Sequence, residues 1–182
     1  MVEAPTIQFQ KEQRTIVADS SSQQKVSTAL TSTDKSGKST PIHITSNHLV
    51  YRDSDREAKY QGEVLARGPD ITLTSSQMEV FFAAASQSAK ATAPADAPAK
   101  VEKIIASGSV VVTQPTRHAT GDKLTYTSED DRFILTGGPP SIFDAERGKI
   151  TGVSLTLFRR DDRVIVDGSS SLPAVTNTRV VR

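Results

Sequence analysis

The feature that most constrains the fold of this chain is a repeated 19-residue block in which apolar and polar residues alternate and glycine comes last. The clearest copies are residues 44–62, 119–137 and 150–168. In each copy the sixth and eighth residues are apolar or aromatic, and so are the fifteenth and seventeenth, beyond a polar middle. Alternation with a period of two is the pattern of a strand with one buried face, and a turn-rich middle is typical of a hairpin tip. Each block is therefore predicted to form a β-hairpin.

Two weaker copies, residues 2–20 and 73–108, extend the pattern, and the second is split by an insertion rich in Ala and Pro. One hairpin cannot bury its apolar face alone, so the copies are expected to stack and to share a continuous apolar interior. The sequence thus predicts an all-β fold, in which residues 1–182 form one domain of about five repeats. Residues 86–100 have the composition of a flexible loop, and residues 169–182 form a tail with no clear register.

The alternation continues past the glycine of a block, through Val64 and Ala66 after Gly62, for example. The glycine therefore lies inside a long strand, where it usually marks a bend, a bulge or a close backbone approach. We expect it to be the crease at which the sheet folds over. Helix signals are weak: only residues 75–88 could be argued to be helical, and a strand explains them equally well. Val26 to Leu30 fit a short additional strand.

Composition excludes several classes of function. The formal net charge is +1, from 22 basic and 21 acidic residues, which gives no overall field to attract nucleic acid. There are no cysteines, which excludes disulfides, thiolate zinc sites and a cysteine nucleophile. The longest apolar run, residues 80–85, is far shorter than the roughly 20 residues of a membrane-spanning helix. Residues 1–30 carry no recognisable secretory signal.

Three segments, residues 41–64, 119–137 and 149–168, carry a family resemblance. Each combines a small residue followed by a polar one, Leu-x-Tyr or Leu-x-Leu, a charged turn, an apolar triplet and a late glycine. This framing resembles the OstA-like (LptA-like) family of periplasmic lipopolysaccharide-transport proteins, and Gly121 with Asp122 matches the recurrent small-acidic pair of that family. The resemblance implies a twisted, open-ended OstA-like β-jellyroll.

The resemblance also implies a function. An apolar groove would carry the lipid A acyl chains of lipopolysaccharide, or a similar envelope lipid, across the periplasm to the outer membrane without catalysis. Partners would be other OstA-like domains, joined by edge-strand pairing, with head-to-tail self-association as a further expectation. An alternative is a structural or protein-interaction β-repeat scaffold of a cell-envelope protein. An enzyme is the weakest reading.

The inward-facing residues of the blocks are the candidates for lining the groove, although they could equally form a dry core. They are Ile7, Phe9, Leu49, Tyr51, Tyr60, Met78, Val80, Ile104, Leu124, Tyr126, Phe133, Leu135, Leu155, Leu157, Val164 and Val166. Basic residues near the groove mouth could meet the phosphates of a headgroup, although most such residues are solvated charges. These candidates are Arg67, Arg117, Arg147 and Lys149.

Acidic residues recur at the predicted hairpin tips and raise the question of a calcium site. They are Asp53 and Asp55, Glu129 to Asp131, and Asp161 and Asp162. Each group is bracketed by arginine, and hairpin turns favour Asp for backbone reasons, so we interpret them as turn residues. His43, His48 and His118 share no spacing typical of metal ligands and are expected on the strand surface. No metal or cofactor is predicted, and no catalytic motif is found.

Overall fold

The computed structural model describes residues 1–33, 39–83, 100–146, 148–158, 163–170 and 173–177, and within them the chain forms sixteen strands of one antiparallel sheet. The strands are β1 (Val2–Glu3), β2 (Thr6–Gln10), β3 (Thr15–Asp19), β4 (Val26–Thr33), β5 (Ser39–Ser46), β6 (His48–Arg52), β7 (Glu57–Arg67), β8 (Thr72–Phe82), β9 (Val101–Thr113), β10 (Arg117–Thr127), β11 (Arg132–Thr136), β12 (Ser141–Asp144), β13 (Gly148–Thr151), β14 (Ser154–Phe158), β15 (Arg163–Asp167) and β16 (Val175–Asn177). The predicted all-β fold is confirmed.

Four long strands, β7 to β10, bend in the middle and divide the sheet into two parts. The register of β7 against β8 shifts between Gln61 and Val64, and that of β9 against β10 shifts between Gly121 and Lys123. Gly62 and Gly108 lie at these bends with φ of +75° and +80°, the left-handed conformation that glycine adopts at little cost. The predicted glycine crease is confirmed at these strands.

One part, which we call the first half-sheet, contains the hairpin-tip ends of β7 to β10 together with β2, β3, β6, β11, β14 and β15. Two inward rows of paired residues run through all ten of its strand segments. The row nearer the crease is Ile7, Ala18, Leu49, Tyr60, Met78, Ala106, Leu124, Leu135, Leu155 and Val166. The row nearer the hairpin tips is Phe9, Ile16, Tyr51, Ala58, Val80, Ile104, Tyr126, Phe133, Leu157 and Val164.

The other part, the second half-sheet, contains the remaining ends of β7 to β10 together with β1, β4, β5, β12, β13 and β16. Its inward row is Val2, Thr28, Ile44, Ala66, Leu73, Val112, Ala119, Ile142, Ile150 and Thr176. Because side chains alternate between the two faces of a strand, the apolar faces of both half-sheets are turned into one shared interior.

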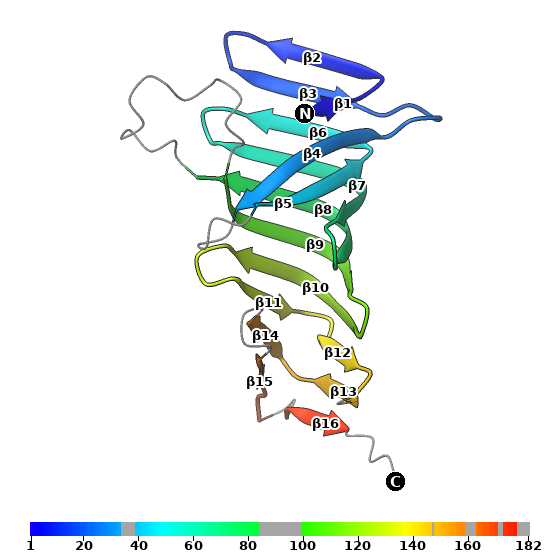
Figure 1. Cartoon of the computed structure of the whole chain (residues 1–182), viewed down its shortest axis with the longest axis vertical. Helices are drawn as coiled ribbons and strands as arrows, with labels where there is room; N and C mark the ends of the chain where they lie inside the picture. Colours follow the sequence, from blue (N-terminus) through cyan, green and yellow to red (C-terminus); the bar gives the residue numbers. More distant parts are fainter. Residues whose placement is uncertain (34–38, 84–99, 147, 159–162, 171–172, 178–182) are drawn as a thin grey trace.

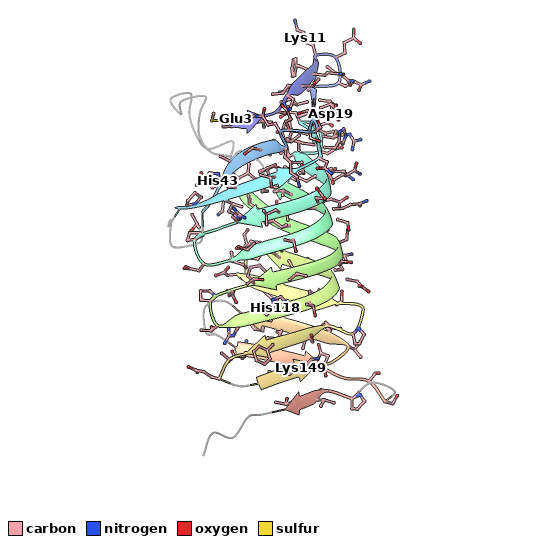
Figure 2. The ribbon with its side chains drawn as sticks, turned by 90° about the vertical axis from the view of Figure 1, so that its right-hand side faces the viewer. Glu3, Lys11, Asp19, His43, His118 and Lys149 are labelled. Atoms are coloured by element: carbon pink, nitrogen blue, oxygen red, sulfur yellow. The ribbon has the colours of Figure 1, made fainter. Side chains whose placement is uncertain are left out.

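The strands stack along a long axis, with the β2–β3 hairpin at one end and β16 at the other (Figure 1). In the perpendicular view Lys11 marks the first end and Lys149 lies near the second, and the strands cross the axis between them (Figure 2). The described part of the chain contains no helix, and thus none long and apolar enough to cross a membrane.

The structure decides the secondary structure of segments that the sequence left ambiguous. Residues 72–82 form β8, so the helical alternative for this region is excluded. Val26 lies at the start of the expected additional strand, β4, and residues 175–177 form β16 against β13. The expected flexible loop at 86–100 lies outside the described residues, apart from Lys100.

Candidate functional site

Two neighbouring cavities lie between the half-sheets. The larger has a volume of about 250 Å³ and the smaller of about 120 Å³. The larger is lined by Thr40, Ile42, Ile44, Ala66, Gly68, Pro69, Ile71, Leu73, Met78, Ile104, Leu124, Tyr126, Asp131 and Phe133. The smaller is lined by Ile71, Val112, Gln114, Arg117, Ala119, Leu124, Phe133, Leu135, Leu157 and Phe158. Ile71, Leu124 and Phe133 line both, so the two spaces adjoin at these side chains.

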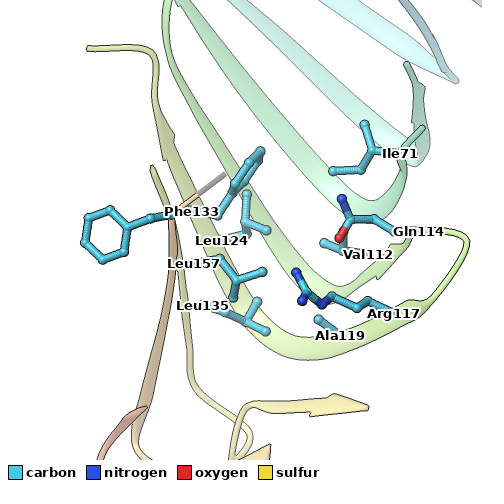
Figure 3. Close-up of a pocket in the computed structure, with 10 residues that line it drawn as sticks. Ile71, Val112, Gln114, Arg117, Ala119, Leu124, Phe133, Leu135 and Leu157 are labelled. Atoms are coloured by element: carbon cyan, nitrogen blue, oxygen red, sulfur yellow. The ribbon is translucent and has the colours of Figure 1, made fainter. Parts of the chain in front are cut away.

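The wall formed by the first half-sheet consists of residues from its two inward rows. Leu124, Leu135, Leu157 and Phe133 face Ile71 and Val112 across the smaller cavity (Figure 3). The rings of Tyr126 and Phe133, which are cross-strand neighbours, lie 4.6 Å apart between centroids. Such aromatic pairs gain about 0.5–1.5 kcal/mol beyond the area they bury, so the pair stabilises this wall.

The predicted groove residues fall into three groups. Met78, Ile104, Leu124, Tyr126, Phe133, Leu135 and Leu157 line the cavities. Leu49, Tyr60, Val80 and Leu155 are buried in the packed interior, and Tyr51, Val164 and Val166 are partly buried against it. Phe9 is 65% exposed and Ile7 is 49% exposed, because β2 is the last strand of the first half-sheet. The part that these residues play in lipid binding stays a prediction.

Sequence reasoning missed the opposite wall. The second half-sheet contributes Ile42, Ile44, Ala66, Leu73, Val112 and Ala119, and the β7–β8 connection contributes Ile71. A signal for part of this wall existed, since the alternation visibly continues beyond the crease glycines through Ala66 and Val112. What the alternation does not reveal is which residues lie across the interior from one another.

A buried ion pair borders the smaller cavity. Arg117 Nε donates to Asp144 Oδ2 at 2.7 Å, and the two residues are direct cross-strand neighbours on β10 and β12. The other carboxylate oxygen of Asp144 accepts the backbone N–H of Glu146. On the larger cavity, the Tyr126 hydroxyl donates to Asp131 Oδ1 at 3.1 Å. Arg117 and Tyr126 are thus each held by a carboxylate of the protein.

Three of the four candidate headgroup residues are described by the structure, and of these three only Arg117 lines a cavity. Arg67 and Lys149 are exposed, and each follows or precedes an inward residue of its strand, so their side chains lie on the outer face. Arg147 lies outside the described residues.

The acidic groups lie where turns were expected. Asp53 and Asp55 lie in the turn between β6 and β7, and Glu129 to Asp131 lie in the turn between β10 and β11. Asp161 and Asp162 are outside the described part. The described residues contain no group of three or more His, Cys, Asp or Glu arranged to hold a metal ion.

The histidines lie on strands, as expected. His43 and His118 are exposed, and His48 is half-buried. The Nδ1 atom of His48 lies 2.6 Å from Asp19 Oδ1, which ties β6 to the end of β3.

The interior is tightly packed between the cavities and the β2 end. Toward β2, Ala18, Val26, Leu49 and Tyr60 are fully buried and line neither cavity. Burial raises the pKa of Tyr60 from its usual 10.0 to about 12, and the neighbouring Thr28 hydroxyl offsets part of this shift. Both cavities therefore lie on the other side of Tyr60, between β5 and β14.

Comparison of the chain with known proteins agrees with this architecture. Residues 43–163 match the family described as LptA/(LptD N-terminal domain) LPS transport protein. No curated protein sequence matches. Among the solved structures with a similar fold is LptH, described as the LptA homologous periplasmic component of the lipopolysaccharide transport device from Pseudomonas aeruginosa. It is 13% identical, with a TM-score of 0.59, and the match covers 75% of this chain and 95% of LptH. Because the family match spans most of the sheet, the chain belongs to the LptA/LptD N-terminal family of lipopolysaccharide transport proteins.

Proposed function

We propose that this chain carries lipopolysaccharide by sheltering its acyl chains in the two cavities between the half-sheets. The observation that supports this most is that both walls are predominantly aliphatic and aromatic around unfilled space. Removing apolar surface from water yields roughly 25 cal/mol per Å², so an acyl chain entering these cavities is bound without any specific polar contact. No catalytic step is part of the proposal.

The polar groups at the cavities support an orientation for the lipid. Asp131 lies at a hairpin tip of the first half-sheet, and Gln114 and Arg117 lie at the connection between β9 and β10 in the second half-sheet, so all three are far from the crease, whereas the crease side is formed by small and apolar residues. A lipid with its acyl chains toward the crease leaves its sugar and phosphate groups toward the tips and solvent. Arg117 is the basic residue best placed to meet a phosphate, although it is already paired with Asp144.

The lipid proposal is tested by capture with a photo-crosslinking residue at Phe133, which borders both cavities. Leu124→Asp and Leu135→Asp place a carboxylate on the cavity wall and are expected to abolish capture of purified lipopolysaccharide. Thr127→Asp is the control, because Thr127 alternates with the inward Tyr126 and faces outward beside Arg132 and Lys103. Equal capture by all three variants would contradict the proposal and favour a scaffold without lipid.

We further propose that the chain acts in the periplasm as one unit of a bridge. Within the described residues, each of the end strands β2, β1, β15 and β16 pairs on one side only. An unpaired edge is a ready template for another strand, so neighbouring domains of the same fold can add to it. Stacking a second domain on β2 would also cover the exposed Ile7 and Phe9 and extend both inward rows.

A further inference from the structure

The hairpin tips of the first half-sheet share one backbone position. The tips of the β2–β3, β6–β7 and β10–β11 hairpins lie on the same side of the stack (Figure 1). The thirteenth residue of each repeat block is the last residue of its turn, and these residues, Arg14, Arg56 and Asp131, have φ of 48°, 49° and 48°. Asp131 lines the larger cavity, so this position borders the interior where the cavity reaches the tips.

At two of these three tips, the residue at this position has a partner within the protein. Arg14 Nη2 lies 2.6 Å from Asp53 Oδ2 of the next tip. Asp131 Oδ1 accepts a hydrogen bond from the Tyr126 hydroxyl at 3.1 Å. The third residue, Arg56, is half-buried, and its side chain makes no hydrogen bond or ion pair with the described residues. Its Nη1 atom is buried without a hydrogen-bond partner.

The acidic residues of the Arg56 hairpin are engaged elsewhere. Their partners are Arg14 and Tyr51 for Asp53, Ser54 for Asp55, and Arg52 and Lys59 for Glu57. A guanidinium keeps its charge and carries five N–H donors, so burying one of its nitrogens without an acceptor costs free energy. Arg56 therefore calls for an acceptor from outside the chain.

The guanidinium of Arg56 lies near inward residues of the first half-sheet. Burial raises the pKa of the Tyr51 hydroxyl, and the nearby charge of Arg56 offsets part of this rise. The Arg56 carbonyl accepts the backbone N–H of Phe82, whose ring lies 6.1 Å from the Tyr51 ring between centroids. Phe82 ends β8, the strand that contributes Met78 to the larger cavity. Arg56 thus lies at the tip next to a strand that borders this cavity.

Two other arginines beside the interior are bound differently. Arg117 is held by Asp144 at 2.7 Å. Arg132 has a buried Nε atom without a hydrogen-bond partner, but its Nη2 atom lies 3.6 Å from Asp130. Arg132 also alternates with an inward residue of β11, so it faces outward. Of these three guanidinium groups, that of Arg56 is the one without a carboxylate partner.

We propose that Arg56 binds a phosphate group of the lipid headgroup at the tip side of the interior. This inference rests on the proposed lipid binding in the cavities. A guanidinium matches two oxygens of a phosphate with two parallel hydrogen bonds, and the phosphate supplies the acceptor that the chain does not. Acyl chains beside Met78 leave the headgroup toward the tips, where Arg56 lies.

The test compares lipid with and without phosphate on the full chain. Purified lipopolysaccharide, or the same lipid after enzymatic removal of its phosphates, is titrated against protein that carries a photo-crosslinking residue at position 133. The lipid concentration that gives half-maximal capture measures the affinity. In the unaltered background, removal of the phosphates should weaken binding by roughly tenfold, because charge-assisted hydrogen bonds are lost.

Arg56→Gln removes the charge and keeps an amide donor. It should weaken capture of the phosphorylated lipid by roughly tenfold and leave capture of the dephosphorylated lipid unchanged. Arg56→Lys keeps the charge without the planar fork, so it should recover part of the affinity. Arg52→Gln is the matched control, because Arg52 lies on the same hairpin, has a side chain that is 46% exposed and already faces Glu57 at 3.9 Å. It should change neither affinity.

A competition with inorganic phosphate separates a lipid headgroup from free phosphate as the ligand. Millimolar inorganic phosphate should not displace the lipid, because it makes none of the apolar contacts that hold the acyl chains. Displacement from the unaltered chain but not from Arg56→Gln would overturn the headgroup assignment and give the site to free phosphate.

The outcomes separate the phosphate site from the function on which it rests. If Arg56→Gln captures both lipids as the Arg52→Gln control does, or weakens capture of both equally, the phosphate site is refuted and lipid binding stands. If the unaltered chain captures neither lipid, both proposals fail.

Discussion

The side chain of Asp122 packs directly on Gly137: a Cβ atom added at Gly137 would lie 2.8 Å from the Cβ atom of Asp122. Gly137 has φ of +78°, and its carbonyl accepts the backbone N–H of Asp122 at 3.1 Å. The chain thus turns from β11 toward β12 at a glycine, because the positive φ disfavours other residues and a side chain would collide with Asp122.

The same relationship recurs in the two preceding repeats. A Cβ atom added at Gly62 would lie 2.8 Å from Asn47 Nδ2, and one added at Gly108 would lie 2.8 Å from the Ser76 side chain. The polar residue near the start of a block therefore packs on the glycine of a neighbouring strand. This explains why the sequence pairs a small-polar dipeptide with a late glycine.

Replacing Gly137 should destabilise the fold where the chain turns from β11 toward β12. We expect Gly137→Ala to lower the free energy of unfolding by about 1–3 kcal/mol, because a non-glycine residue is strained at positive φ and the new Cβ meets Asp122. Urea unfolding followed by circular dichroism measures the loss. Gly168→Ala, in the exposed segment after β15, should change stability by less than about 0.5 kcal/mol. Equal losses would contradict the packing account.

The Arg117–Asp144 pair should contribute far more to stability than an exposed pair. Its side chains are 14% and 7% exposed, against 44% and 73% for Lys25 and Glu63. Asp144→Asn takes the charged hydrogen-bond acceptor away from a buried guanidinium, so it should cost about 3–5 kcal/mol. Lys25→Ala should cost less than about 1 kcal/mol. Thermal or urea unfolding distinguishes the two, and a small effect of Asp144→Asn would mean that solvent already reaches Arg117.

Ionisation of Tyr60 should weaken the fold at high pH. Its pKa is raised from 10.0 to about 12 by burial, so the neutral form is favoured in the folded chain. The resulting stability is fully present below pH 10 and is lost as pH rises toward 12. At pH 11 the expected loss is about 1.4 kcal/mol relative to neutral pH.

Urea unfolding at pH 8 and pH 11 measures this loss against Tyr60→Phe, which cannot ionise at that position. The variant should lose less stability than the unaltered chain over the same interval. Identical pH dependence would show that the Tyr60 hydroxyl reaches solvent.

Exposed apolar residues at the β2 end should promote association. Phe9 is 65% exposed, so Phe9→Asp should fold normally and shift self-association to higher protein concentration. Light scattering across a dilution series measures the shift. Gln8→Asp adds the same charge on the outer face of the same strand and serves as control. A chain that stays monomeric at every concentration would count against a bridge.

The all-β fold was predictable because alternation and turn residues are local signals. One example is the hairpin in which Leu124 pairs with Leu135 and Tyr126 pairs with Phe133. The spacing of these apolar residues on the two sides of the turn is enough to indicate this register. The strands of the second half-sheet were harder to predict. β12 and β13 are only four residues long each and were not recognised, because so short a segment carries too little alternation.

The site was predictable on one wall and not on the other. Periodicity identifies Leu124 and Phe133 as inward residues, but it does not reveal that Ile71 and Val112 lie opposite them. That relationship depends on how far the sheet folds at its creases. For the same reason the sequence gives no sign that Tyr60 is packed while Met78 borders open space.

Adjacent residues of β11 test the central claim most directly. Phe133 lines both cavities, whereas Ile134 alternates to the outer face of the same strand, where it pairs with Thr125 and Thr156. A photo-crosslinking residue is placed at one position or the other, and the protein is irradiated with purified lipopolysaccharide. The account predicts a lipid adduct from position 133 and little or none from position 134. Equal adducts from both positions, or an adduct from 134 alone, would contradict lipid binding between the half-sheets.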